Sequence, residues 1–249
     1  MTEPAFATLL AAAAVAALVV DFLKTSLGGG IGLVLTPTLS LVLPAPVVLA
    51  LIAPLMVLSD PITLRYYWRQ WDSRELAVLL PTTVAGVVAG TWLLAVLSEP
   101  ALRRVIGSGA LVFAVLQLVA SVAPRPVASR QSWRAGAAAG LVTGVASSVA
   151  HSGGIVLGLY LVAKRLAPPT IVATSGALVA VADVFKLAGY WHIGFLSRSI
   201  LIAALAAVPC LLAGAWLGYR VNRVLPRRAF ELVLIGIAIA GALRLLLGG

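Results

Sequence analysis

Six ionisable side chains interrupt the long apolar stretches of this sequence. Five lie inside apolar runs and the sixth, a histidine, lies in a glycine-containing break: they are Asp21, Lys24, Asp60, Asp183, Lys186 and His151. A charge inside such a run is costly to bury, so groups of this kind usually pair with one another and mark a functional site. A histidine there titrates near neutral pH and could couple binding to protons, although a packed, satisfied histidine is the competing interpretation.

The spacing of these groups leaves alternatives open. Asp21 and Lys24 are three residues apart, so on a helix they could neutralise each other at its end, or Lys24 could face an anion site that Asp21 tunes. The stretch Ser59-Asp60-Pro61 has the form of a helix N-cap followed by proline. Its counterpart Asp183 has no proline after it and forms an i, i+3 pair with Lys186. We therefore expect buried polar groups, with a role in proton coupling left open, at Asp21, Asp60, Asp183 and Lys186.

Two glycine-rich breaks lie next to these charges. Residues 28–32 hold four glycines in five positions, and a second break covers residues 150–155. Glycine runs do not support an ordinary helix interior. The backbone amides that start the following helix, together with the positive end of its dipole, form an anion-binding surface, so a small oxyanion is the predicted ligand. The candidate substrate-binding residues are Lys24, Thr25, Ser26, Gly28, Gly29, Gly30, Ser148, His151, Ser152, Gly153 and Gly154.

The composition says what kind of chain must position these residues. Of 249 residues, 61% are apolar and only 10% are charged, and the mean hydropathy is +1.09. Such a chain is predicted to be an all-α polytopic membrane protein, because the apolar runs are long and do not alternate as barrel strands do. We interpret the net charge of +10 as a result of the basic residues between the apolar runs, which set membrane topology, and not as a sign of nucleic-acid binding. Neither a phosphate-binding loop nor a zinc or nucleophile motif occurs, so we expect no cofactor, no metal and no enzyme activity.

Ten apolar segments can be drawn, and two of them are short and follow the glycine breaks. The ten segments are 5–23, 31–43, 46–64, 76–97, 102–122, 134–149, 153–163, 170–190, 196–219 and 229–247. The short segments, 31–43 and 153–163, are predicted to be half-helices or short spans at the interface between the two halves of the chain.

The two halves of the chain match at an offset of 123 to 124 residues. Asp60 corresponds to Asp183, and Gly29 to Gly153. We therefore predict an N-terminal repeat over residues 1–123, a cytoplasmic linker over 124–132 and a C-terminal repeat over 133–249. If all ten segments cross the membrane, 13 Lys and Arg residues lie on one side and four on the other, and the repeats are inverted. If each short segment merges with its neighbour, the repeats become parallel.

Several motifs make the chain resemble the TauE/SafE sulfite exporter family. They are the duplication, the glycine run 28–32 followed by Pro37, the aromatic basic loop 66–72 that ends in Asp72, and the stretch 173–175 after a proline turn. The resemblance implies a secondary transporter of a bacterial inner membrane. It implies export of sulfite, sulfoacetate or related organosulfonates by alternating access, with proton coupling left open.

The expected partners are the anionic substrate and the lipid bilayer, with no nucleic acid. A monomer and a homodimer both remain open. The alternatives to a transporter are a membrane-embedded enzyme or assembly factor that uses the same polar cavity, and a passive anion channel.

Overall fold

The computed structural model describes residues 6–27, 31–122, 132–164, 166–222 and 227–247. In these ranges every regular element is an α-helix, as predicted for an all-α polytopic membrane protein. The helices are α1 (Phe6–Leu27), α2 (Ile31–Leu39), α3 (Ala45–Tyr66), α4 (Ser73–Val96), α5 (Glu99–Val122), α6 (Trp133–Ala150), α7 (Gly153–Ala163), α8 (Pro168–His192), α9 (Arg198–Ala206), α10 (Val208–Asn222) and α11 (Arg227–Leu247).

Five of the described helices are long and apolar enough to cross a membrane. They lie in α1, α3, α4, α5 and α8, and a sixth span results if α9 and α10 are taken as one bent element. The predicted segment 196–219 is therefore divided, with a bend of 45° between its two helices. Pro209 stands two residues after the bend at Ala207, and its missing N–H and its ring explain why the helix does not run straight through.

Helix α3 lies at the centre of the bundle. In its membrane-spanning part, 78% of residues are buried, against 28% in that of α5. It runs unbroken from Ala45 to Tyr66 through both Pro54 and Pro61. The alternative that Asp60 caps a helix start is therefore excluded, and Asp60 is buried within the helix. The buried surface of α3 keeps the chain helical past Pro61, which costs one backbone hydrogen bond but does not end the helix.

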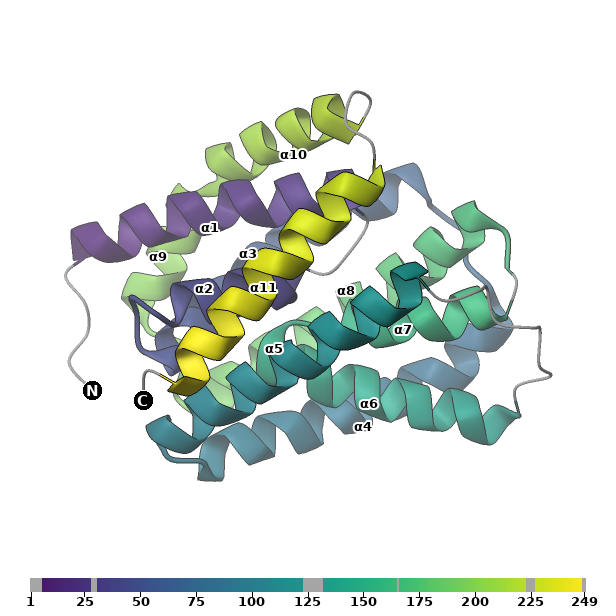
Figure 1. The fold of residues 1–249 in the computed structure, drawn as a ribbon, viewed down its shortest axis with the longest axis horizontal. Helices are drawn as coiled ribbons and strands as arrows, with labels where there is room; N and C mark the ends of the chain where they lie inside the picture. The colour runs from purple at the N-terminus through teal and green to yellow at the C-terminus, as the bar shows by residue number, and fades with distance from the viewer. Residues whose placement is uncertain (1–5, 28–30, 123–131, 165, 223–226, 248–249) are drawn as a thin grey trace.

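Two long helix pairs flank α3. Helix α4 packs along α6, and α1 packs along α10, with α5 beside α11 on another face (Figure 1). The pairs approach closely through glycine: a Cβ at Gly144 would overlap the Thr83 carbonyl oxygen, and one at Gly214 would overlap the Leu18 carbonyl oxygen. Small residues permit such approach where no hydrophobic effect drives helices together. A duplicated chain would pair its helices in this way, but the repeat and its boundaries stay predictions.

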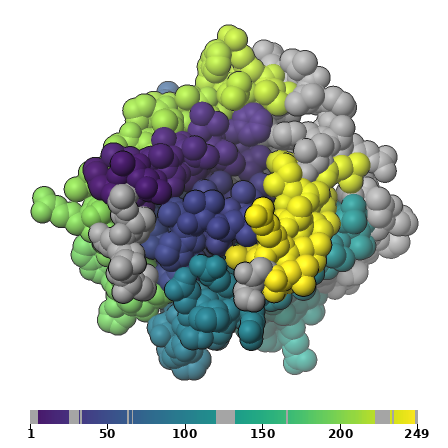
Figure 2. All heavy atoms as spheres, turned by 60° about the vertical axis from the view of Figure 1, so that its left-hand side comes forward, coloured from purple at the N-terminus to yellow at the C-terminus, as the bar shows by residue number. Residues whose placement is uncertain are grey.

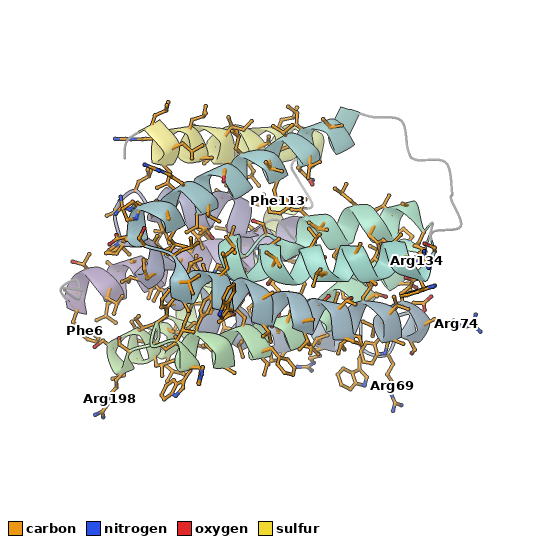
Figure 3. All side chains as sticks on the ribbon, turned by 90° about the horizontal axis from the view of Figure 1, so that it is seen from below. Phe6, Arg69, Arg74, Phe113, Arg134 and Arg198 are labelled. Atoms are coloured by element: carbon orange, nitrogen blue, oxygen red, sulfur yellow. The ribbon has the colours of Figure 1, made fainter. Side chains whose placement is uncertain are left out.

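The short helix α2 is placed by its neighbours. It lies between α1 and α11 on one face of the molecule, as Figure 2 shows. The exposed basic residues gather at the ends of the bundle: Arg69, Arg74 and Arg134 at one end and Arg198 at the other (Figure 3). This division agrees with the two sides assigned from the Lys and Arg distribution.

Candidate functional site

The start of α2 and the end of α6 meet inside the bundle. Gly32, in the first turn of α2, lies so close to the Ala150 carbonyl oxygen and the His151 backbone that a Cβ there would overlap both. Farther along α2, the Thr36 hydroxyl donates to the same Ala150 carbonyl at 3.3 Å. The start of α2 therefore crosses the end of α6. Gly28, Gly29, Gly30 and the side chain of Ser26 lie outside the described residues, so the predictions made for them have no structural description.

The second break is built around His151. Helix α6 ends at Ala150, and His151 caps it in a left-handed conformation with φ 50° and ψ 26°. The backbone N–H of His151 donates to the Ser147 carbonyl at 3.0 Å, and that of Ser152 donates to the Ala146 carbonyl at 3.1 Å. These bonds satisfy the last carbonyls of α6, and α7 begins immediately afterwards at Gly153.

The imidazole of His151 connects this break to α3 and α8. Its Nδ1 lies 2.8 Å from the Lys186 ammonium, and its Nε2 lies 3.2 Å from the Leu49 carbonyl oxygen. An ammonium group can only donate, so Nδ1 is the acceptor and Nε2 carries the proton that it donates to Leu49. Both ring nitrogens are used in this arrangement. His151 therefore positions Lys186 and does not offer a free donor to an anion.

Lys186 is a fully buried cation on α8. Its ammonium forms an ion pair with Asp183 at 2.6 Å, and the side chains of the pair are 0% and 1% exposed. The Ser147 hydroxyl lies 3.5 Å away and the Met56 sulfur 3.8 Å away. The predicted i, i+3 pair is thus formed in the interior, where an unpaired charge would be costly.

A second Lys–Asp pair joins α1 to α3. The Lys24 ammonium lies 2.6 Å from Asp60 Oδ1, and both side chains are largely buried. Of the two alternatives for Lys24, an ion pair with Asp21 at a helix end is therefore not the one observed. Asp21 is buried and accepts a hydrogen bond from the Ser59 hydroxyl. The partner of Lys24 comes from another helix because α1 and α3 pack side by side.

The two ion pairs form one polar cluster. The Lys186 ammonium of one pair lies 3.8 Å from the sulfur of Met56, one helical turn before Asp60 of the other pair, where α3 packs on α8. With Asp21 included, three carboxylates face two ammonium groups. Among the described residues, Oδ2 of each of these three carboxylates is buried without a hydrogen-bond partner. Buried polar atoms are normally satisfied, so the cluster has unused capacity to bind a proton or a donor.

A family model for sulfite exporter TauE/SafE matches residues 13–245 of the chain. The protein belongs to the TauE/SafE family. This confirms the resemblance stated from the motifs. The membership indicates a membrane transporter of sulfur-containing anions, and it agrees with the expectation that the chain is not an enzyme. No curated protein matches the chain, and no solved structure does.

In the other predicted site residues of this TauE/SafE protein, the described hydroxyls bond backbone carbonyls and not the charged groups of the cluster. The Thr25 hydroxyl donates to the Asp21 carbonyl at 2.6 Å within its own helix. Ser148 donates to the Val87 carbonyl of α4 at 3.1 Å, and Ser152 donates to the Ala150 carbonyl at 2.9 Å. These hydroxyls satisfy backbone groups, which is the ordinary role of hydroxyls in membrane helices.

The two glycines that start α7 differ. A Cβ at Gly153 would lie 2.5 Å from the Thr143 carbonyl oxygen, so this glycine allows α7 to fold back on α6. At Gly154 a Cβ would meet nothing within 4 Å. Gly154 therefore borders open space at the N-terminal end of α7.

Some residues of the cluster were missed in the sequence. Met56 lies on the same face of α3 as Asp60, at i−4, and helical spacing from the one charged residue of that run would have found it. Ser59 directly precedes Asp60, and its hydroxyl donates to Asp21. Tyr190 is also buried, and its hydroxyl donates to the Ser148 carbonyl. Its match to Tyr67 at the repeat offset was the available signal.

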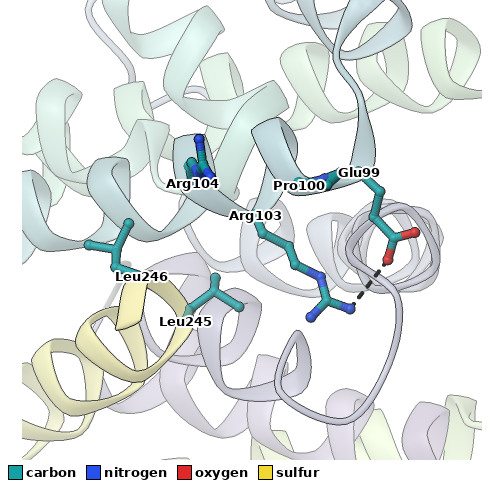
Figure 4. A pocket seen from close by; sticks show the side chains of 6 residues that line it. All are labelled: Glu99, Pro100, Arg103, Arg104, Leu245 and Leu246. Atoms are coloured by element: carbon teal, nitrogen blue, oxygen red, sulfur yellow. Dashed lines mark hydrogen bonds and ion pairs between the residues drawn. The ribbon is translucent and has the colours of Figure 1, made fainter. Parts of the chain in front are cut away.

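Two further groups of residues lie outside the cluster. A surface pocket of about 360 Å³ lies where α5 begins and α11 ends, and it holds an exposed Arg103–Glu99 ion pair at 3.2 Å (Figure 4). At the start of α4, Glu75 binds Lys164 at 2.7 Å and accepts a hydrogen bond from Tyr160 at 2.8 Å. Burial lowers the pKa of Lys164, but the hydrogen bonds with Glu75 and Tyr160 outweigh it and raise the pKa above its usual value.

Proposed function

We propose that this protein is a secondary transporter that exports sulfite, sulfoacetate or related organosulfonates across a bacterial inner membrane by alternating access coupled to protons. The observation that supports the proposal is the contact between the start of α2 and the end of α6, where His151 holds the buried Lys186. Family membership supplies the substrate class.

The chemistry of the cluster suits a sulfonate or sulfite group. Lys24 and Lys186 are point charges with three donors each, which can follow an anion whose oxygens point in several directions. Helix α7 adds the positive end of its dipole. Gly154, at that end, leaves open space beside its backbone. We propose that the anion binds between the lysines and the first turn of α7.

Burial of the cluster favours a transporter over a passive channel. Lys186 and Asp183 have exposed fractions of 0%, and Asp60 is 5% exposed. An anion reaches such a site only if helices move, and a site that opens to one side at a time is the property of alternating access. Relative movement of the pairs α4–α6 and α1–α10 would provide this opening.

Transport can be measured in proteoliposomes loaded with labelled sulfite or sulfoacetate. We expect saturable efflux from the wild type, because the anion occupies a finite site. Lys24→Met and Lys186→Met remove a donor at nearly unchanged volume, so each is expected to reduce efflux at least tenfold. Arg103→Met, which removes an exposed cation, is the matched control and should leave efflux unchanged.

Gel filtration of each variant in detergent shows whether it remains folded. Efflux that rises linearly with concentration, or folded Lys24 and Lys186 variants that transport at the wild-type rate, would contradict the proposed site. Steady electrical conductance through the wild type would instead support the channel.

A further inference from the structure

The two buried lysines are already occupied by carboxylates of the protein. We propose that Asp60 and Asp183 act as internal counter-anions that hold Lys24 and Lys186 in the empty site, and that the transported anion displaces them, so that each displaced carboxylate binds a proton. This inference rests on the proposed function, since it concerns the binding step of the same site.

The geometry of the two pairs is equivalent. Each ammonium lies 2.6 Å from Oδ1 of its aspartate. In each aspartate, Oδ2 is buried and has no hydrogen-bond partner among the described residues. A carboxylate that holds its lysine through one oxygen leaves the other free to receive a proton. When an anion takes its place, the carboxylate loses one short contact with the lysine and not two.

Within the part of the chain that the structure describes, the surroundings of the carboxylates offer no replacement cation. Lys24 of α1 is paired with Asp60 and Lys186 of α8 with Asp183, and Asp21 of α1 accepts from Ser59, the residue before Asp60. His151, which follows α6, is occupied by Lys186 and Leu49, and Tyr190 donates to a backbone carbonyl. The neighbours thus include two further acids, and both lysines would be held by the anion.

Protonation follows from this lack of countercharge. When the anion binds, the Nζ–H···Oδ1 bond breaks and an Nζ–H···O bond to the anion forms. The released carboxylate would then be a buried charge without a partner, which is far less stable than its neutral form. A proton from water therefore adds to a carboxylate oxygen. Anion and proton occupy the site together and leave it together, so transport is symport of the two.

Thermodynamic linkage gives the inference a measurable sign. For each proton that binds with the anion, the affinity rises about tenfold for each unit by which pH falls, so displacement of both carboxylates gives a rise of about a hundredfold. The probe must not titrate itself. Methanesulfonate is suitable because it stays ionised, whereas sulfite takes up a proton near neutral pH.

The test is calorimetric titration of the purified protein with methanesulfonate in buffers of different ionisation enthalpy, at several pH values. The expected result is uptake of about one proton for each carboxylate displaced, and a matching slope of log Kd with pH. Asp60→Asn keeps the shape of the side chain but cannot titrate. In this variant we expect proton uptake to fall by about one if the anion displaces Asp60. Glu99→Gln, which alters an exposed ion pair, should behave as the wild type.

The outcomes separate the inference from the function on which it rests. Methanesulfonate binding by the wild type with no proton uptake would overturn the inference and leave the transporter intact. No binding and no efflux of any sulfur-containing anion would overturn both. Proton uptake by the wild type tests the inference even if Asp60→Asn does not fold. If folded Asp60→Asn takes up as many protons as the wild type, the anion does not displace Asp60 and the exchange is restricted to Asp183.

Discussion

His151 stands in a left-handed backbone conformation that glycine and asparagine adopt more easily. The side chain explains why histidine is found there. Its ring reaches the Leu49 carbonyl on one side and the Lys186 ammonium on the other. A residue chosen only to end a helix would not need two buried hydrogen bonds. We therefore regard His151 as a residue that positions Lys186.

This role predicts the result of His151→Asn. Asparagine tolerates the backbone conformation, so the fold should persist, but it is too short to replace both ring contacts. A hydrogen bond to a charged group contributes about 1.5–3 kcal/mol, so the affinity for a sulfonate should fall about tenfold or more. Calorimetric titration measures this. His192→Asn, at the exposed end of α8, is the control, and equal affinities in the two variants would exclude the positioning role.

Residue spacing predicted the members of the cluster but not their partners. The rule that residues three or four apart share a helix face sees only neighbours within one helix. It found the Asp183–Lys186 pair. It failed for Lys24, whose partner Asp60 is 36 residues away on α3, because the packing of α1 on α3 is not encoded in local spacing.

At the scale of helices, close approach between backbones decides which substitutions are tolerated. Gly144 faces the α4 backbone near Thr83, and an added Cβ would overlap it. Backbone atoms cannot move aside as a flexible side chain would. Gly158, in α7, has nothing within 4 Å of the same position. Substitution of each glycine by alanine therefore separates the effect of close packing, at Gly144, from that of helix propensity, at Gly158.

Gly144→Ala should lower stability by about 1–3 kcal/mol through overpacking. Gly158→Ala should leave it unchanged or raise it by up to about 1 kcal/mol, because alanine favours the helix. Thermal unfolding in detergent compares the two variants with the wild type. Equal melting temperatures for both variants would show that the α4–α6 contact does not require glycine at residue 144.

Helix positions were largely predictable because apolar runs and glycine breaks mark membrane helices well. The short helices at 31 and 153 begin where the breaks end, as expected. The bend at Ala207 was not foreseen, since Pro209 lies within an apolar run that otherwise reads as one span. At Pro61 the apolar run was the better guide: the helix continues through the local signal for a helix start, because α3 is buried.

At the scale of the whole molecule, the charged ends of the bundle define an orientation. Arg69 and Arg198 lie at opposite ends (Figure 3). The Lys and Arg distribution places Arg69 on the cytoplasmic side. The chain has one cysteine, Cys210, which can be replaced by alanine to give a background for labelling.

In that background, Arg69→Cys should react with a membrane-impermeant thiol reagent only in inside-out vesicles, and Arg198→Cys only in intact cells. Both positions are exposed, so access to the reagent depends on the side of the membrane alone. The extent of labelling is read by mass spectrometry. Labelling of both positions from one side would refute the predicted topology and with it the inverted repeats.

The contact between the start of α4 and the end of α7 distinguishes the two predicted halves of the chain. Glu75 forms an ion pair with Lys164 and accepts a hydrogen bond from Tyr160. At the repeat offset these three residues correspond to Ser199, Ser40 and Thr36, none of which carries a charge. Under the proposed alternating access and the predicted repeat, this ion pair would hold one side of the protein closed, and the corresponding described residues of the other half could form no such pair. The side that the Glu75–Lys164 ion pair holds should open less readily, so the protein without substrate would be open to the opposite side most of the time.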